Sequence, residues 1–463
     1  MDQELTAQEL KAREMGTQPV WKLLWKYFVP GFVGMFFNSL YNVVDRIYIG
    51  RGMGSYALAG LSVVYPIMII GAAFGMMIGI GSAVRISISL GKKDFLRAER
   101  ILGNGLSLMI IVSLLYTLLG YLFKNPLLRR FGASGETFAY ANDYLNIIIA
   151  GGILQTVGFA LNTIIRSEGN ARIAMYSMMI SAGVNIVLDP IFIFGFGMGV
   201  QGAAWATIIS MAALCVWVLY HFTRGKRAVV RLKRSAMKMD WDIVKYILAI
   251  GISPFSMHVA SSAVQAILNH SLVRYGGDIA VGVNGIINSV AMLIIMSIVS
   301  INMAIQPIIG YNYGAEYYQR VKDTLRAGML FATSISVASW LIIMCFPGPI
   351  IKLFNANDLE LYNVGIEGIR IFLLMLPIVG FQIVEGSYFQ AVGKALISLF
   401  LTLLRQVLAL IPLLLLLPGF FGLRGVWAAI PTADLFSACI ASFFLIREWK
   451  SLTRKQQGVA VEG

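Results

Sequence analysis

Apolar residues occur along this chain in long runs separated by short polar connections. Windows of about 19 residues pick out twelve such runs, each long enough to cross a bilayer as a helix. They lie at residues 27–50, 56–89, 101–123, 139–165, 173–195, 199–222, 243–273, 279–310, 325–350, 364–390, 395–418 and 422–446. The runs do not alternate in polarity with a period of two, which disfavours an outer-membrane barrel. The pattern predicts an all-α integral membrane protein with twelve transmembrane helices.

Composition supports this prediction. Of the 463 residues, 58% are hydrophobic and 13% are charged, against roughly a quarter charged in soluble domains. The start of the chain is polar and mixed in charge, so no cleavable signal peptide is expected. Cys215, Cys345 and Cys439 each lie inside an apolar run, so neither a disulfide framework nor a metal site is expected.

The formal net charge of +14 is a topology signal. Basic residues sit between the apolar runs and form no continuous stripe, so a nucleic-acid partner is not expected. If both termini lie on one side, the connections on that side carry 26 Lys and Arg, and those on the other side carry 9. The positive-inside rule then predicts a multi-pass protein of the cell (inner) membrane with both termini in the cytoplasm.

The longest basic connection lies near the middle of the chain, and the two parts that it separates resemble each other. Sliding the sequence along itself by 223 or 224 positions matches residues at a nearly constant offset. The matches are Pro30 with Pro254, Asp45 with Asn269, Gly52 with Gly276, Gly91 with Gly314, Arg97 with Arg320, Gly169 with Gly393, Ala171 with Ala395, and GVQGAAWA (199–206) with GLRGVWAA (422–429). We therefore predict an N-terminal six-helix half at 1–223, a basic cytoplasmic linker at 224–241 and a C-terminal six-helix half at 242–463.

An even number of helices in each half makes the two halves parallel. They are then related by a pseudo-two-fold axis along the membrane normal, an architecture in which a substrate site lies between rocking halves. The duplication favours a transporter, expected to work as a monomer in the bilayer. A receptor or membrane enzyme would need a soluble ligand-binding part or a catalytic cluster, and the sequence shows neither.

A few polar groups inside the apolar runs of the first half are candidates for function, because an ionisable group in the hydrocarbon region is costly unless paired, hydrated or protonated. Asp45 lies near the end of the first run. Asn185 and Asp189 lie four residues apart in the fifth run, so they share one helix face. Thr207 follows in the sixth run. If these helices pack together, the four side chains converge in one poorly solvated pocket.

Such a pocket would hold a small cation. Two close carboxylates in a low dielectric share a proton, and all the candidate ligands are hard oxygens that also suit Na⁺. The alternative is structural: Asp45 would be exposed beside Arg46 at the membrane surface, and Asp189 would end a helix beside Pro190.

The second half carries Glu385, Arg405 and Asp434 inside apolar runs. A buried Arg requires an acidic partner, so one interpretation is an internal salt bridge. The other makes Glu385 or Asp434 a second cation site, or a charge in the cleft that attracts cationic substrates.

The sequence contains no GxxxxGK[ST], HExxH or GxSxG motif, and His221, His258 and His270 share no metal-ligand spacing. We therefore expect no enzyme activity and no cofactor, with transport driven by an ion gradient. Among 22 Met and 54 aromatic residues most serve membrane packing, and some suit a wide pocket for lipophilic cations.

Several short motifs together resemble the multidrug and toxic compound extrusion family over about residues 20–450. They are VDRIYIG (44–50), LGKKD (90–94), RSEGNAR (166–172), NIVLDPIFIFG (185–195) and QPIIGYNYGA (306–315). The resemblance implies export of varied, mostly cationic organic compounds in exchange for protons or sodium, through a V-shaped cleft between the halves. In related members a cation site matches Asp45, Asn185, Asp189 and Thr207. Another branch uses acids in helices seven and ten, but here the seventh helix has only Asp242 at its start, and Glu385 lies closer to the FQAVGK turn (389–394) than that branch's acid.

We expect an outward-open state to bind a proton or Na⁺ at Asp45 and Asp189, with Asn185 and Thr207 lending oxygens. Pro30 and Pro254 mark where the first and seventh helices lack a hydrogen bond and could bend. The alternative function is a lipid-linked oligosaccharide flippase of the same superfamily. It would need several arginines in the cleft to suit a pyrophosphate.

Overall fold

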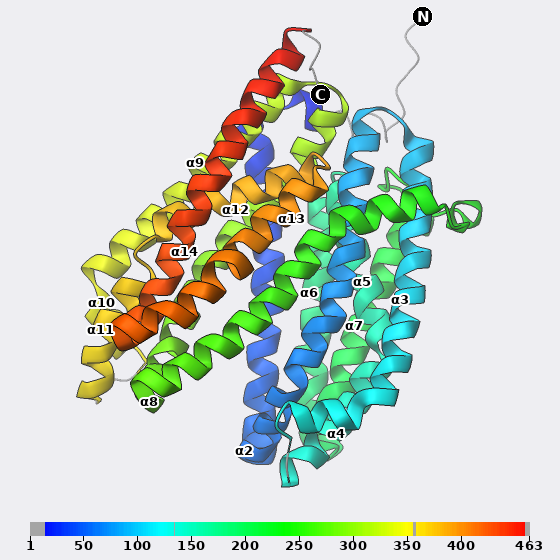
Figure 1. Ribbon diagram of the computed structural model, residues 1–463. Helices are drawn as coiled ribbons and strands as arrows, with labels where there is room; N and C mark the ends of the chain where they lie inside the picture. Colours follow the sequence, from blue (N-terminus) through cyan, green and yellow to red (C-terminus); the bar gives the residue numbers. More distant parts are fainter. Residues whose placement is uncertain (1–13, 134, 355–357, 459–463) are drawn as a thin grey trace, which may run out of the picture. The chain divides into compact units, whose positions relative to one another are not determined.

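Helices form the regular secondary structure throughout the part of the chain that the computed structural model describes, which is residues 14–133, 135–354 and 358–458 (Figure 1). The elements are α2 (Val20–Gly91), α3 (Phe95–Arg130), α4 (Gly135–Ala150), α5 (Gly152–Ser167), α6 (Ala171–Pro190), η1 (Ile191–Gly195), α7 (Gly199–Arg224), η2 (Arg234–Met237), α8 (Trp241–Gly314), α9 (Tyr318–Cys345), α10 (Pro347–Lys352), α11 (Leu359–Phe372), α12 (Leu376–Ala391), α13 (Ala395–Leu403), η3 (Leu404–Leu410) and α14 (Ile411–Gln456).

The number of membrane spans follows from the glycines that break the longest helices. In the described residues, seven helices are long and apolar enough to cross a membrane, and nine spans result if each of two bent pairs counts once. The bent pairs are α4 with α5 (55°) and α11 with α12 (44°). Gly277 divides α8 and Gly422 divides α14, so two of the nine consist of two arms each. The arm of α2 before Gly54, residues 20–53, is not among these nine, and counting it with them gives twelve helices. The predicted all-α membrane fold with twelve helices is confirmed.

Backbone conformation repeats along the chain with the spacing seen in the sequence. Gly54 (φ +78°, ψ −167°) breaks α2, and Gly277 (φ +62°, ψ −161°) breaks α8 at the equivalent position. Only glycine adopts such dihedral angles without large strain. The same offset, to within one residue, relates further positive-φ pairs: Gly169 with Gly393, Gly199 with Gly422, and Lys93 with Glu316. The internal duplication therefore extends to the main chain.

The described chain divides into two compact units. The first comprises the residues up to Gln18 together with Lys26–Phe255, and the second comprises Pro19–Trp25 together with the residues from Ser256 onward. The structure leaves residues 225–240 between α7 and α8, within the predicted linker at 224–241, and these residues are called the linker from here on. The first unit thus includes the linker and the first turns of α8. Close packing explains the latter, because a Cβ on Gly251 of α8 would lie 2.0 Å from the carbonyl oxygen of Met77 in α2. The division into halves at 224–241 follows helix count and repeat symmetry, and it stays a prediction.

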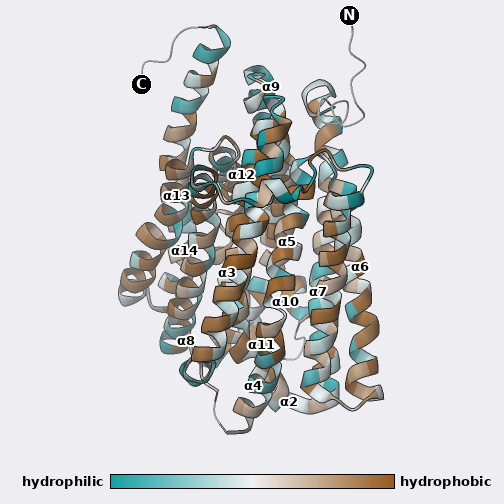
Figure 2. Ribbon diagram, turned by 90° about the vertical axis from the view of Figure 1, so that its right-hand side faces the viewer, coloured by the Kyte–Doolittle hydropathy of each residue, from teal (hydrophilic) through white to brown (hydrophobic). Residues whose placement is uncertain are grey.

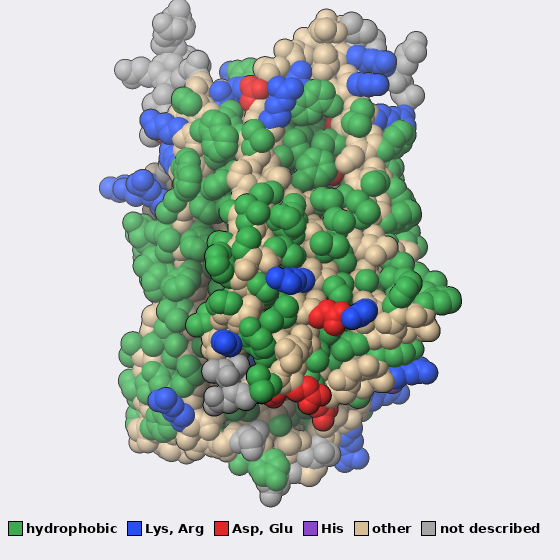
Figure 3. Space-filling view, turned by 90° about the vertical axis from the view of Figure 1, so that its left-hand side faces the viewer, with side chains coloured by type: hydrophobic (Ala, Val, Ile, Leu, Met, Phe, Trp, Pro, Cys, Tyr) green, Lys and Arg blue, Asp and Glu red, His purple; other side chains and the backbone are tan. Residues whose placement is uncertain are grey.

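Hydrophobic side chains cover much of the surface of individual helices. Along α3, Leu114, Leu118 and Leu122 form an exposed stripe at four-residue spacing. Figure 2 shows hydrophobic segments along most helices, and Figure 3 shows a face on which hydrophobic side chains predominate. Because soluble proteins rarely leave such large apolar areas in water, these surfaces contact lipid. The protein is a multi-pass membrane protein.

Candidate functional site

The four polar residues singled out in the first half lie on three helices of the first unit. Asp45 is in α2, Asn185 and Asp189 are in α6, and Thr207 is in α7. Asn185 and Asp189 are 0% exposed, and Asp45 and Thr207 are 8% exposed. All four are therefore withdrawn from the surface, although each belongs to a residue type that is usually exposed.

The carboxyl groups of Asp45 and Asp189 are within hydrogen-bonding reach of each other. An ionised carboxylate can only accept, so a hydrogen bond between them requires one group to carry a proton. The Asn185 Nδ2 amide donates to Asp189 Oδ1 at 3.3 Å. Their spacing along α6 accounts for this contact, since residues four apart lie one turn above each other.

Apart from the contact between the two carboxyl groups, three buried oxygens at this cluster have no hydrogen-bond partner among the described residues. They are Asp45 Oδ1, Asn185 Oδ1 and Asp189 Oδ2. A buried polar atom without a partner costs free energy, and oxygens of this kind are the ligands that protons and hard cations take. The arrangement can bind a proton or a small cation.

Two tyrosines that the sequence analysis did not single out also belong to the cluster. The hydroxyl of buried Tyr144 in α4 lies within hydrogen-bonding reach of the hydroxyl of Thr207. Tyr41 lies one turn before Asp45 in α2, and its hydroxyl is near enough to both carboxyl groups for their charges to act on it. The four-residue spacing of Tyr41 and Asp45 is a signal that could have been used. Tyr144 comes from another helix, and nothing in the local sequence marks it.

The ends and packing of the helices place these side chains. α6 ends at Pro190, directly after Asp189, and continues as the π-helix η1, a form that often occurs at functional sites. α7 packs closely against η1, because a Cβ on Gly202 would lie 2.9 Å from the carbonyl carbon of Phe192. This close approach brings α7, and with it Thr207, against the end of α6.

The alternative in which Asp45 is a surface residue paired with Arg46 does not fit this arrangement. Asp45 is buried, whereas Arg46 is exposed and its guanidinium lies 5.4 Å from the ring centroid of Tyr65. Asp189 does lie at the end of α6, but it is fully buried there. A position at a helix end therefore coexists with membership of the cluster.

In the second unit, Arg405 and Asp434 form an ion pair. The Arg405 Nε donates to Asp434 Oδ1 at 2.7 Å, which links η3 to α14. The internal salt bridge expected from the sequence is therefore present between these two residues. Glu385 in α12 is fully buried and stands apart from this pair, since neither of its carboxyl oxygens has a hydrogen-bond partner among the described residues.

The two prolines considered as bending points lie inside long helices. Pro30 is in the first arm of α2, and Pro254 is in the first arm of α8. The non-helical dihedral angles in these helices occur at Gly54 and Gly277 instead. A bend at the prolines would accompany a change of state, so their role stays a prediction.

Comparison with known proteins places the whole chain in one family of sequences. The family model MatE matches residues 30–191 and again residues 254–415. The multidrug export protein MepA of Staphylococcus aureus (strain MSSA476) is 26% identical over 432 residues, covering 93% of this chain and 95% of that protein. MepA of Staphylococcus haemolyticus (strain JCSC1435) is 26% identical over 426 residues, covering 92% and 93%.

Solved structures show the same fold. The outward-facing conformation of a multidrug resistance MATE family transporter of the MOP superfamily has a TM-score of 0.89 at 26% identity, covering 98% of this chain and 100% of that one. A MATE crystal structure in the bent conformation has a TM-score of 0.91 at 26% identity, covering 97% and 99%. A Pyrococcus furiosus MOP superfamily transporter, described as having a binding pocket of reverse polarity that suggests a different function, has a TM-score of 0.89 at 26% identity, covering 97% and 100%.

Proposed function

Because the chain belongs to the multidrug and toxic compound extrusion (MATE) family of transporters, we propose that it exports mostly cationic organic compounds in exchange for H⁺ or Na⁺ bound at Asp45, Asn185, Asp189 and Thr207. The multidrug export proteins among its relatives support the export of varied compounds. The ion coupling rests on the residues of the cluster.

The observation that carries the proposed coupling is the pair of buried carboxyl groups. Asp45 and Asp189 approach within hydrogen-bonding reach, and each has a buried oxygen with no partner other than the second carboxyl group. Two ionised carboxylates at this distance in a poorly solvated site would repel each other strongly. Binding of one positive ion removes that repulsion and supplies the partner that the free oxygens lack.

Exchange follows if the ion and the organic cation favour different states of the protein. A state in which the cluster is closed to water is stable only when a cation neutralises it, because an uncompensated buried charge costs several kcal/mol. An organic cation bound elsewhere in the same cleft, or at the same carboxylates, would stabilise the opposite state. The two ligands would then be coupled through the conformational equilibrium.

The charge of the cluster favours cationic cargo over the pyrophosphate of a lipid-linked oligosaccharide. The polar side chains that meet at the cluster are two carboxyls, an amide and hydroxyls. The guanidinium nearest in sequence, that of Arg46, is exposed over Tyr65, from where its charge acts on Asp45 alone of the two carboxyl groups. A flippase would require basic groups in their place.

The orientation of the protein follows from its charges. The excess of Lys and Arg on the terminus side supports both termini in the cytoplasm, with the protein in the cell (inner) membrane. Export then runs from the cytoplasm to the outside, and it is driven by the coupling ion as the ion moves inward down its gradient.

The proposed exchange can be tested with the purified full-length protein in proteoliposomes loaded with a cationic dye such as ethidium. Imposing a proton gradient and a sodium gradient separately identifies the driving ion. Dye movement that depends on one gradient supports the exchange. Dye movement that is unaffected by either gradient would refute the coupling, while leaving transport itself established.

A further inference from the structure

The linker between α7 and α8, residues 225–240, is held against the helices of the first unit by buried polar side chains. Glu168, at the end of α5, is fully buried. Its Oε2 accepts hydrogen bonds from the backbone N–H groups of Val229 (2.9 Å) and Val230 (3.0 Å), and its Oε1 is bonded to Asn170 and His221. A buried carboxylate with every acceptor used fixes the backbone that it contacts.

A second anchor lies on α3. The buried side chain of Asn104 donates to the carbonyls of Ala236 and Lys238, both at 3.2 Å, and accepts from the N–H of Asp240 at 2.7 Å. One turn further along, the Ser107 hydroxyl donates to the carbonyl of Met237 at 2.9 Å. The linker is therefore fastened along one face of α3.

The linker also comes very close to the backbone of α3. A Cβ on Gly103 would lie 2.3 Å from the carbonyl oxygen of Ala236, so only glycine permits this contact. η2, which lies in the linker, packs on α3. This contact fixes how deep along α3 the linker lies.

The depth matters because α3 enters its apolar run at residue 101. The contacts with the linker, from Glu99 to Ser107, fall on the turns at which the sequence of the helix changes from polar to apolar residues. This change in the sequence indicates that the linker lies at the level of lipid headgroups. Trp241, which directly follows it, is 68% exposed, as is usual for tryptophan at a membrane interface.

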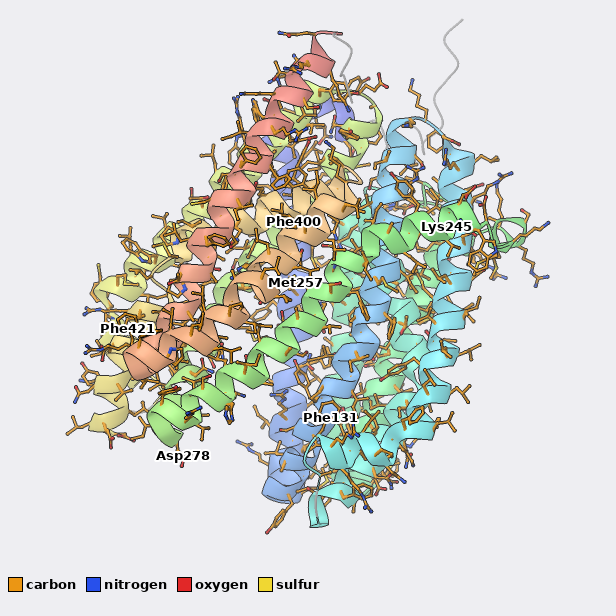
Figure 4. The ribbon with its side chains drawn as sticks, viewed as in Figure 1. Phe131, Lys245, Met257, Asp278, Phe400 and Phe421 are labelled. Carbon is orange, nitrogen blue, oxygen red and sulfur yellow. The ribbon has the colours of Figure 1, made fainter. Side chains whose placement is uncertain are left out.

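The charge of the linker is strongly positive. Its six cations, Lys226, Arg227, Arg231, Lys233, Arg234 and Lys238, are all exposed, and Lys245 adds another on the first turns of α8 (Figure 4). Its one acid, Asp240, is used at the start of α8, where its carboxylate accepts from the N–H of Asp242 at 3.0 Å. In the described part of the chain only Lys233 of these seven cations has an ion-pair partner, Glu99.

We propose that the linker is a binding surface for anionic phospholipids, whose phosphate groups its exposed cations contact. Unpaired cations at headgroup depth attract an anionic leaflet, and their attraction is additive over the residues near the surface. The anchors hold the backbone in place, so the linker loses less conformational entropy on binding than a flexible loop would. The proposal does not depend on the transported compound or on the coupling ion.

Native mass spectrometry of the full-length protein in detergent tests this proposal. Phosphatidylglycerol and phosphatidylcholine with the same acyl chains are titrated against the wild type, Arg231→Gln/Arg234→Gln, and the control Arg129→Gln/Arg130→Gln. The control changes two exposed arginines at the other end of α3. We expect the wild type to prefer phosphatidylglycerol and the linker variant to bind it about 25-fold more weakly, since each cation contributes about fivefold. The control should change binding by less than about twofold.

Several outcomes would overturn the proposal. They are the absence of a phosphatidylglycerol preference in the wild type, equal losses in both variants, and displacement of the lipid by an equal concentration of inorganic phosphate. Ionic strength gives a test that needs no substitution. Raising it from about 0.1 M to about 1 M shortens the screening length from about 10 Å to about 3 Å, so the preference should disappear. A preference that persists at high salt would contradict a surface of exposed charges.

Discussion

The carboxyl groups of Asp45 in α2 and Asp189 in α6 lie within hydrogen-bonding reach of each other, in a part of the first unit that is closed to solvent. The two side chains come from different helices, and the backbone amides around them are used within those helices. A bound cation is thus the partner best suited to their free oxygens.

Replacing one carboxyl of this pair should uncouple transport. In Asp189→Asn the amide cannot gain or lose a proton and contributes no charge to a bound Na⁺. We expect ion-driven dye movement in proteoliposomes to fall by at least about tenfold, with normal expression. Asp143→Asn is the matched control, because Asp143 lies in α4 of the same unit and its carboxylate accepts from Gln201 at 3.1 Å, outside the cluster. Equal activity of the two variants would remove Asp189 from the mechanism.

The Tyr144 hydroxyl should tune the affinity for the coupling ion without being required for transport. Tyr144→Phe removes the hydroxyl that lies within hydrogen-bonding reach of Thr207 and leaves the ring in place. A neutral hydrogen bond contributes about 1 kcal/mol, so the ion concentration for half-maximal transport should rise about fivefold while the maximal rate is kept. Tyr140→Phe, one turn earlier on α4, serves as the control. An unchanged concentration dependence in Tyr144→Phe would show that the hydroxyl does not act on the ion.

The ion pair in the second unit should matter for stability. Arg405→Ala leaves the Asp434 carboxylate, whose side chain is 6% exposed, without its partner. We expect a loss of about 3 kcal/mol in the free energy of unfolding, measured in detergent. The double variant Arg405→Met/Asp434→Leu should recover most of it, because it leaves no unpaired charge.

A contrasting pair provides the reference for that experiment. Lys233 and Glu99 also form an ion pair, but the Lys233 side chain is 56% exposed. Lys233→Ala should cost less than about 1 kcal/mol. If both single variants lost the same amount, burial would not be the reason for the effect at Asp434.

The helix breaks give a prediction about the main chain alone. A Cβ on Gly54 would meet no atom within 4 Å, yet its dihedral angles strain any other residue. Gly54→Ala should therefore destabilise the protein by about 1–3 kcal/mol. Gly183→Ala, inside α6 and equally unobstructed, should instead stabilise it by up to about 1 kcal/mol. Thermal unfolding that shifts in the same direction for both variants would contradict this account.

The sequence predicts the features that depend on local pattern. The twelve spans follow from apolar run length, and the pairing of Asn185 with Asp189 follows from helical periodicity. Contacts between separate helices cannot be predicted from such local patterns. Tyr144 reaches Thr207 from another helix, and Arg405 has Asp434 and not Glu385 as its partner. Both choices depend on packing between segments distant in the chain.

Glycines with positive φ occur at equivalent positions of both halves, as Gly54 with Gly277 and Gly199 with Gly422. The acidic cluster occurs in the first half alone of the described residues. The residue 224 positions after Asp45 is Asn269, and the residue 223 positions after Asp189 is Pro412. The main-chain geometry of the internal repeat is thus present in both copies, whereas the acidic side chains are present in one. If the proposed coupling acts through these acids, the other copy does not carry that constraint, and its side chains can diversify toward new cargo without loss of the energy supply.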